Sequence, residues 1–390
     1  MSSKSYEVPV EAGVMKWARE SAGRTIGDVA KRLAVDEELV NGWECGRKKP
    51  TISQLRSLAK YYQRPTDAFL LMVPPQEPPL PHDFRTLPNK ERTSLHAETF
   101  FALRKARRLQ EIASELKGDF KGILLDKIDN LSDAELVAAK AREYLGIDPQ
   151  IQSQWKDNSA ALKQWIKLIE SKMDIIVIQI PMPIEDARAF ALRGKGYPII
   201  VLNTNDSKNA RIFSLFHELG HVLLDEDSIC NLEGDLGSEG FCNNFAGAFL
   251  VPKDELLKSQ IVVSRNSNEN WSDKSLKSLS RSFKVSEEVV LRRLLKFGLT
   301  TKEYYKSKRQ EWAILEEQRR IEKETRQKET QEKQTIRRNV ARECIQRNGE
   351  SIVSLILESY YADKLTKYDI SSYLEVNLKH LPKIEKTLWA

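Results

Sequence analysis

Apolar side chains recur every three or four residues through the first part of the chain, between residues 13 and 72. The recurring positions are Val14, Trp17 and Ala18, then Ile26, Val29, Ala30 and Leu33, and then Leu55, Leu58 and Ala59. A spacing close to the helical period predicts helices whose apolar stripes share one core. We therefore expect closely spaced short helices here, with Thr25 as the N-cap of the second.

The middle of the chain changes from a helical to a strand pattern. Residues 95–172 contain few helix breakers, which predicts a mainly helical stretch. Short runs of β-branched residues follow at 174–180 and 197–203, with turn residues around them. These runs predict strands, and 188–193 is a third candidate.

Helical patterns return after the strands. One helix is expected at about 209–224 and another at about 239–250. Residues 275–299 predict two short helices around a turn. Residues 306–345 are dense in Lys, Arg, Glu and Gln without sustained heptads, which favours a single solvated helix over a coiled coil. Residues 350–390 regain apolar content and predict a small helical end piece.

A proline-rich segment marks the clearest boundary. Residues 74–81 read PPQEPPLP and hold five of the 15 prolines, which predicts a semi-rigid linker. The expected parts of the chain are 1–72, a linker at 73–94, 95–305, 306–345 and 346–390. The fold class is α+β and mostly helical.

Composition excludes several classes of protein. The 390 residues favour two or three domains, and 62 basic against 56 acidic residues give a net charge of only +6. No apolar run is long enough for a membrane span, and the N-terminus has no signal-peptide pattern. Four widely spaced cysteines without a CxxC motif argue against a disulfide scaffold and a cysteine zinc finger. We expect a reducing, cytoplasmic location and no membrane partner.

The sharpest chemical signal is the motif HELGH at residues 217–221. On a helix, His217 and His221 lie four residues apart on one face, where two imidazoles can bind one metal ion. Glu218 lies beside them and can take a proton from water held by the metal. Zinc, Zn²⁺, suits this ligand set because it takes imidazole readily and lowers the pKa of bound water to about 7.

A catalytic zinc needs a third protein ligand and one open position. On spacing, Glu226, Glu233 and Glu239 all remain candidates. Glu239 opens the expected 239–250 helix, and Asn243 lies on the same face, where it can support a ligand by hydrogen bonding. Cys230 and Cys242 are better explained as small buried residues than as ligands.

The runs FSLFHELGHVLL and EGFCNNFAGAFLVP resemble the ImmA/IrrE family of zinc metallopeptidases. In that family, the third ligand is the glutamate that begins an ExxxN helix with a Leu-Leu-Met-Pro-like stop. The matching residues here are Glu239, Asn243 and the stop at 250–252. The resemblance implies Glu239 as third ligand. It also implies a regulatory endopeptidase whose protein substrate is a DNA-binding, helix-turn-helix repressor.

The N-terminal segment resembles a Cro/C1-type helix-turn-helix domain through TIGDVA at 25–30, WECG at 43–46 and the following Pro-Thr and leucines. The helix that would enter the DNA groove is expected at about 36–44 and begins Asp36-Glu37-Glu38. The negative charge of these three side chains repels DNA phosphates. The basic residues Arg47, Lys48 and Lys49 follow and are candidate phosphate contacts. DNA binding and protein docking therefore both remain open.

Two hypotheses follow from these motifs. The first is a cytoplasmic zinc endopeptidase with an N-terminal helix-turn-helix domain, in which a strand before the HELGH helix binds substrate in extended form. The second is a DNA-binding transcriptional regulator, or an antitoxin-like protein, whose metallopeptidase-like domain senses or docks. No residue is evident as a second oxyanion stabiliser, and Tyr197 is a candidate by position only.

Overall fold

The computed structural model describes residues 6–76, 95–123, 133–194, 196–224, 235–264, 270–330 and 339–389. The chain divides into two compact units. The first comprises Met1–Arg108 and Pro181–Arg188, and the second comprises Leu109–Ile180 and Ala189–Ala390. No helix in the described ranges is both long enough and apolar enough to span a membrane.

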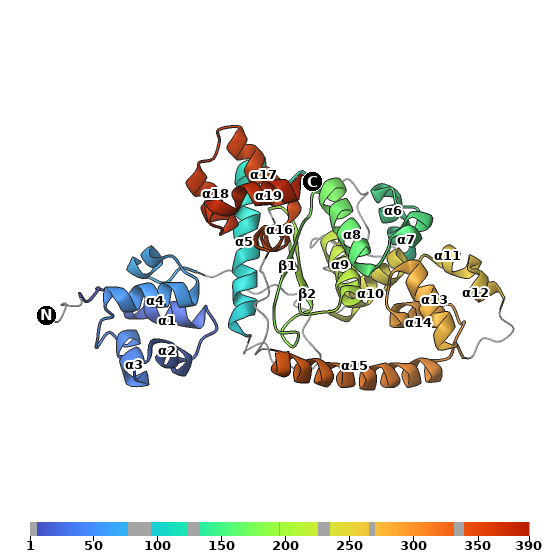
Figure 1. Ribbon diagram of the computed structural model, residues 1–390, viewed down its shortest axis with the longest axis horizontal. Helices are drawn as coiled ribbons and strands as arrows, with labels where there is room; N and C mark the ends of the chain where they lie inside the picture. The colour runs from blue at the N-terminus through green and yellow to red at the C-terminus, as the bar shows by residue number, and fades with distance from the viewer. Residues whose placement is uncertain are drawn as a thin grey trace. The chain divides into compact units, whose positions relative to one another are not determined.

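The first unit contains the short helices expected from the apolar pattern (Figure 1). They are α1 (Ala12–Glu20), α2 (Ile26–Leu33), α3 (Glu37–Glu44), α4 (Ile52–Tyr62) and the 3-10 helix η1 (Thr66–Leu70). Their shared core includes the fully buried Trp43, Tyr62 and Phe69. Thr25 caps α2 through a capping box with Asp28, as expected, and a second capping box starts α4.

The expected domain 95–305 is divided differently in the structure. The helix α5 (Ala97–Lys117) begins in the first unit and ends in the second. At its start, the buried carboxylate of Asp186 accepts hydrogen bonds from the backbone N–H of His96 (2.8 Å) and the hydroxyl of Thr99 (2.6 Å). Residues 181–188 therefore cap α5 within the first unit. This contact joins residues far apart in the chain, so no local sequence pattern predicts it.

The second unit is built around a three-stranded sheet. Its strands are β1 (Ile176–Ile180), β2 (Ala189–Leu192) and β3 (Ile199–Asn203), which confirms all three expected strands. The order is β1-β3-β2, with β1 parallel and β2 antiparallel to the central β3. Every residue of β3 is buried, which explains its uninterrupted apolar sequence.

Helices α8 (Asn158–Met173) and α9 (Lys208–Leu223) contact this sheet, and the helices packed around them extend the main core away from it (Figure 1). The other helices of this region are α6 (Ala134–Leu145), α7 (Pro149–Gln154), α10 (Asp235–Leu250), α11 (Lys253–Lys258), α12 (Gln260–Val263), α13 (Asp273–Phe283) and α14 (Glu287–Lys296). The rings of Trp165, Phe216 and Phe249 meet at the centre, with centroids 4.0–5.4 Å apart. This aromatic contact joins α8, α9 and α10.

The C-terminal boundary expected at residue 345 falls inside a helix of the structure. The charged helix α15 spans Lys302–Thr330, and α16 already begins at Val340 and continues to Asn348. Ala341 and Cys344 are buried, so α16 belongs to the packed region rather than to the solvated helix. The region continues with α17 (Glu350–Tyr361), α18 (Lys367–Leu374), the 3-10 helix η3 (Leu378–His380) and α19 (Leu381–Leu388). Ala341 and Cys344 are only two apolar positions within a highly charged sequence, and this pattern was too weak to predict α16.

A buried carboxylate joins this C-terminal region to the sheet. Glu170 of α8 accepts hydrogen bonds from the Ser351 hydroxyl (2.8 Å) and the Val177 backbone N–H (3.2 Å). Gly349 has a positive φ of 83°, and a Cβ there would lie only 3.1 Å from the Glu170 carboxylate. The close approach of Gly349 to Glu170 fixes the path of the chain where α16 ends and α17 begins, next to β1. Burial raises the pKa of Glu170 to about 7.

We predict that Glu170→Gln makes stability less dependent on pH. Because the folded-state pKa lies above the ordinary 4.5, the stabilising effect of a protonated Glu170 is present below pH 4.5 and is lost as pH rises through about 7. Relative to the Gln variant, the wild type should lose up to about 3 kcal/mol of unfolding free energy between those limits. Urea unfolding across this pH range measures it, and parallel pH profiles for the two proteins would contradict the prediction.

Candidate metal centre

Helix α9 brings the two histidines of the HELGH motif together. Ser207 caps its N-terminus by accepting a hydrogen bond from the Ala210 N–H, which fixes where the helix begins. His217 and His221 then project from one face, with their Nε2 atoms 3.2 Å apart. Both imidazoles are buried, and Glu218 is buried beside them. Burying these three polar side chains costs folding free energy unless each has a specific partner.

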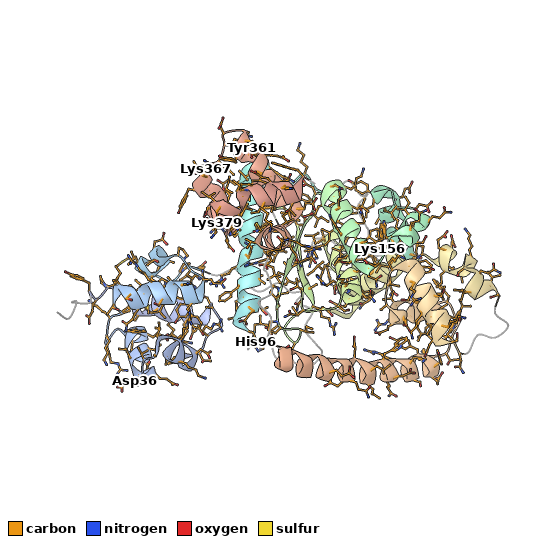
Figure 2. The ribbon with its side chains drawn as sticks, in the orientation of Figure 1. Asp36, His96, Lys156, Tyr361, Lys367 and Lys379 are labelled. Atoms are coloured by element: carbon orange, nitrogen blue, oxygen red, sulfur yellow. The ribbon has the colours of Figure 1, made fainter. Side chains whose placement is uncertain are left out.

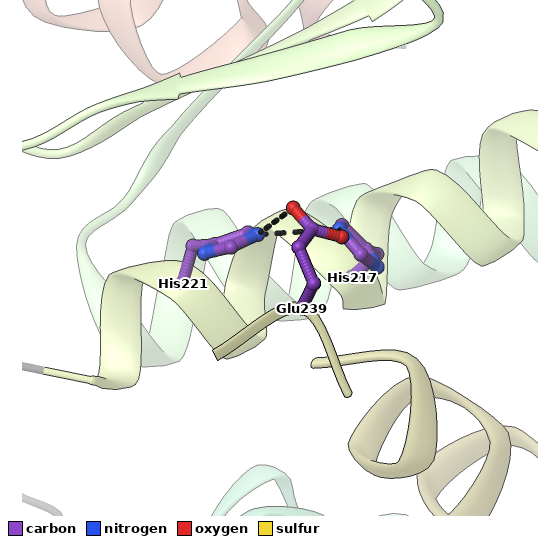
Figure 3. Close-up of side chains that lie close together, drawn as sticks. All are labelled: His217, His221 and Glu239. Carbon is purple, nitrogen blue, oxygen red and sulfur yellow. Dashed lines mark hydrogen bonds and ion pairs between the residues drawn. The ribbon is translucent and has the colours of Figure 1, made fainter. Parts of the chain in front are cut away.

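Helix α10 brings Glu239 to the same point (Figure 3). Its Oε2 lies 3.4 Å from His217 Nε2, and its Oε1 lies 3.3 Å from His221 Nε2. The two imidazoles hold the pKa of the Glu239 carboxyl far below its usual range. The Glu239 side chain is 40% exposed while the imidazoles are at most 2% exposed, so the cluster is open on the Glu239 side. The helix begins at Asp235, not at Glu239 as expected, so Glu239 lies in its second turn.

The separations of these atoms fit tetrahedral metal ligation. Zinc bonds to His nitrogen and carboxylate oxygen are about 2.0–2.2 Å long, which places neighbouring tetrahedral ligands roughly 3.3–3.5 Å apart. The observed separations are 3.2, 3.3 and 3.4 Å. Within the described ranges, these three residues form the one cluster of His, Cys, Asp or Glu ligand atoms close enough to hold a metal ion. The donor set of two imidazoles and one carboxylate is one that zinc favours when a fourth position stays open.

The alternative ligands do not alter this arrangement. Glu226, Glu233 and Cys230 lie outside the described residues. Cys242 is buried and faces the backbone of α9, with its Sγ 3.1 Å from the position that a Cβ on Gly220 would take. The thiol therefore fills the contact between α9 and α10, consistent with its expected role as a small buried residue.

Asn243 lies against the first histidine. Its Oδ1 is 3.2 Å from His217 Nδ1. When Nδ1 carries the proton and donates to Asn243, the lone pair of Nε2 is left facing Glu239 and His221. Such a contact would support the imidazole if His217 binds a metal ion.

Two matches to protein families agree with this geometry. Residues 170–295 match the peptidase M78 family model, described as the IrrE N-terminal-like domain, and residues 12–70 match a helix-turn-helix domain model. The chain joins a region similar to the IrrE N-terminal-like domain to a region similar to a helix-turn-helix domain. No curated protein matches the chain in sequence. The metal cluster lies inside the first match, and α1–α4 lie inside the second.

The sequence pattern did not indicate a basic residue that holds α9, the helix that carries His217 and His221. Arg193 follows β2 directly and donates from one guanidinium nitrogen to the backbone carbonyls of His221 (2.7 Å) and Leu224 (3.2 Å). A cation at these carbonyls satisfies the C-terminus of α9 and complements its dipole. Arg193 therefore links strand β2 to the helix turn that carries His221. A single arginine outside the motif gave no sequence signal of this role.

Buried polar side chains also anchor the other ligand helix. The last carbonyls of α10 accept hydrogen bonds from Arg142 to Phe249 (2.7 Å), from Gln152 to Leu250 (3.0 Å) and from Arg293 to Val251 (2.9 Å). Burial lowers the pKa of Arg142 to about 10. With both ligand helices anchored at their C-termini, Glu239 is held against the histidines by rigid elements.

Tyr197 makes its described contacts away from the histidines. Its ring packs edge-on to Phe120 at 5.3 Å, and Lys117 Nζ lies 5.2 Å from the ring centroid. Its backbone carbonyl accepts a hydrogen bond from Gln110. These contacts are all with α5 and the segment after it, and they give no support to a role in stabilising an oxyanion.

The helix-turn-helix domain exposes acidic and basic residues at opposite ends of α3. Asp36, Glu37 and Glu38 are exposed at its start, and Arg47, Lys48 and Lys49 are exposed after its end. The carboxylate of Glu37 lies 3.1 Å from the position that a Cβ on Gly27 would take, in the first turn of α2. A helix N-terminus attracts anions, so this carboxylate lies where a phosphate would otherwise be favoured.

We predict that Gly220→Ala weakens metal binding because Gly220 sets the spacing of α9 and α10. A Cβ at this position would lie 3.2 Å from the Cα of Cys242, which forces α10 and hence Glu239 to shift. Affinity for Zn²⁺, measured by chelator competition, should fall about tenfold or more. Gly240→Ala is the control, because a Cβ there meets no atom within 4 Å. Equal zinc affinity in the two variants would contradict the prediction.

We also predict that Asn243→Ala lowers metal affinity about 10- to 100-fold, because His217 loses the partner that orients its ring. Its neighbour Asn244 is exposed and bonds the Gly240 carbonyl instead, so Asn244→Ala should leave the affinity unchanged. Isothermal titration with Zn²⁺ compares the two variants. An unchanged affinity in Asn243→Ala would exclude this role for the amide.

Proposed function

We propose that the chain is a zinc-dependent endopeptidase of regulatory type, which hydrolyses a peptide bond in a specific protein such as a DNA-binding repressor. The observation that carries the proposal is the convergence of His217, His221 and Glu239 at separations suited to tetrahedral zinc. The match of the surrounding residues to a peptidase family supports it. Fusion to a helix-turn-helix domain supports a regulatory role.

In this proposal, His217, His221 and Glu239 hold the ion, which when bound supplies Lewis-acid polarisation of the scissile carbonyl and lowers the pKa of water. Glu218 is the general base: it accepts the proton of the attacking water and later delivers it to the leaving amine. Its burial on α9, beside both histidines, keeps this carboxylate in a dry environment. Asn243 orients His217 by accepting from its Nδ1.

The strand β2 offers a means of binding the substrate. It pairs with β3 along one side and has no other strand partner in the described sheet. An extended peptide could add to this edge by backbone hydrogen bonding. Arg193 joins the end of β2 to the backbone carbonyl of His221 on α9. A peptide bound along β2 would therefore lie close to α9.

We predict that Glu218→Gln folds and keeps its zinc but loses peptide hydrolysis by about 10²-fold or more, because the general base is removed while the ligands remain. DNA-binding proteins encoded beside the gene are the first substrates to test, with cleavage read by mass spectrometry. The wild type should leave casein-like proteins largely intact. Cleavage by Glu218→Gln at the wild-type rate would contradict the assigned role, and broad degradation of unfolded proteins would contradict the regulatory one.

The second candidate is a DNA-binding regulator whose peptidase-like domain senses or docks, which the helix-turn-helix match favours. The exposed acidic start of α3 argues that duplex binding by this domain is weak.

We predict that Asp36→Asn/Glu37→Gln/Glu38→Gln raises duplex affinity of the full chain, because the field at the groove-facing end of α3 becomes less negative. Replacing Arg47, Lys48 and Lys49 with alanine should lower that affinity for all sequences and flatten its salt dependence. The wild type should bind random duplexes no more tightly than about 10⁻⁶ M at physiological salt. Selection of one duplex sequence at nanomolar affinity by the wild type would instead favour the regulator.

A further inference from the structure

Three lysines form a row on the C-terminal helices. Residues 378–388 run as η3 directly into α19, and Lys379, Lys383 and Lys386 follow one another at intervals of four and three residues. Within α19, a spacing of three residues places Lys383 and Lys386 on one helix face, and Lys379 lies in η3 just before it. All three are exposed, while Ile384 is fully buried on the packed side. Figure 2 shows Lys379 and Lys367, at the start of α18, on the outer side of the same helices.

The carboxylates near this row are engaged elsewhere. Glu385 accepts a hydrogen bond from the Tyr361 hydroxyl at 2.6 Å. Asp369 is held in the capping box of α18 by Thr366, and Glu375 lies 3.9 Å from Arg347. Among the described residues, no carboxylate forms an ion pair with Lys379, Lys383 or Lys386. The three ammonium groups are therefore available to a polyanion.

Two exposed aromatic rings lie at the end of the row. Tyr361 is 58% exposed and Trp389 is 56% exposed, and their ring centroids are 6.0 Å apart. Trp389 follows Lys386 by three residues, which places it near the same helix face. The hydrogen bond from Tyr361 to Glu385 fixes the tyrosine ring instead of leaving it free to rotate. Such paired rings offer flat apolar faces to bases, and indole and phenol rings are the usual stacking partners of unpaired nucleotides.

We propose that Tyr361, Lys379, Lys383, Lys386 and Trp389, together the lysine–aromatic surface, bind single-stranded nucleic acid. The lysines would contact successive phosphates, and the rings would stack on bases. A duplex offers phosphates but hides its base faces, so the rings favour single strands. None of these residues belongs to the metal cluster or to the helix-turn-helix domain, and the proposal does not depend on peptide hydrolysis.

The test measures binding of labelled oligonucleotides to the full chain by fluorescence anisotropy, over a range of salt. The probes are single-stranded oligothymidylate and oligouridylate of roughly 20 nucleotides, a duplex of the same length, and poly-glutamate as a polyanion without bases. We expect single strands to bind more tightly than the duplex or poly-glutamate. The tighter of the two single strands identifies DNA or RNA as the source of the ligand. Binding to poly-glutamate as tight as to oligonucleotides would show charge attraction alone and overturn the proposal.

The variants separate the surface from other basic residues. Lys379→Glu/Lys383→Glu/Lys386→Glu should abolish most single-strand binding, and neutral alanine variants of the same lysines should lower the log–log salt slope by about 2, at roughly 0.7 per phosphate. The matched control is Lys156→Glu/Lys163→Glu/Lys167→Glu, which makes the same charge change at three exposed lysines. Lys163 and Lys167 are on α8, and Lys156, labelled in Figure 2, lies between α7 and α8. It should leave most of the binding intact.

The role of stacking is tested at Trp389. Trp389→Ala should weaken single-strand binding about fivefold or more, and Trp389→Phe should restore much of it. Circular dichroism confirms that each variant is folded. Equal losses in the two lysine triples, or no effect of Trp389→Ala, would each overturn the proposal.

Discussion

The close contact between α9 and α10 is the constraint on which the metal cluster depends. Gly220 and Cys242 meet where a side chain on Gly220 would come within 3.2 Å of the neighbouring backbone. This approach allows Glu239, three residues before Cys242, to reach both imidazoles of α9. Three Lewis bases then lie 3.2–3.4 Å apart, a separation suited to a shared cation. The elements of the second unit that contact these two helices hold them in place: α6, α8, α14, β2 and β3.

That support comes from apolar packing and from buried polar anchors. Trp165, Phe216 and Phe249 lock α8, α9 and α10 together at their centre. Arg193 satisfies carbonyls at the end of α9, and Arg142 and Arg293 satisfy those at the end of α10. The guanidinium groups of Arg142 and Arg293 are buried, and a buried guanidinium is costly without such acceptors, so these two arginines specify one arrangement of α10. A ligand cluster positioned by helices in this way needs little reorganisation when an ion binds.

Local patterns predicted the parts of the fold that local physics determines. Strand runs, the Thr25 cap and the HELGH helix follow from periodicity and capping, and the structure confirms these elements. The pairing of Glu239 with the histidines needed the resemblance to a family, because spacing alone left Glu226 and Glu233 open. Contacts between distant residues escaped prediction: Asp186 capping α5, Arg193 capping α9, and Glu170 joining Ser351 across the sheet. The start of α16 was missed because two buried positions are a weak pattern within a charged sequence.

The most direct test of the central claim is the metal content of the chain purified without chelator, measured by mass spectrometry with inductively coupled plasma. We predict about one zinc per chain in the wild type, none in His217→Ala or His221→Ala, and strongly reduced zinc in Glu239→Ala. Wild-type protein that neither contains nor takes up zinc would contradict the metal site as a whole. Stoichiometric zinc in Glu239→Ala, held at wild-type affinity, would contradict the cluster described here and would return Glu226 or Glu233 as the third ligand.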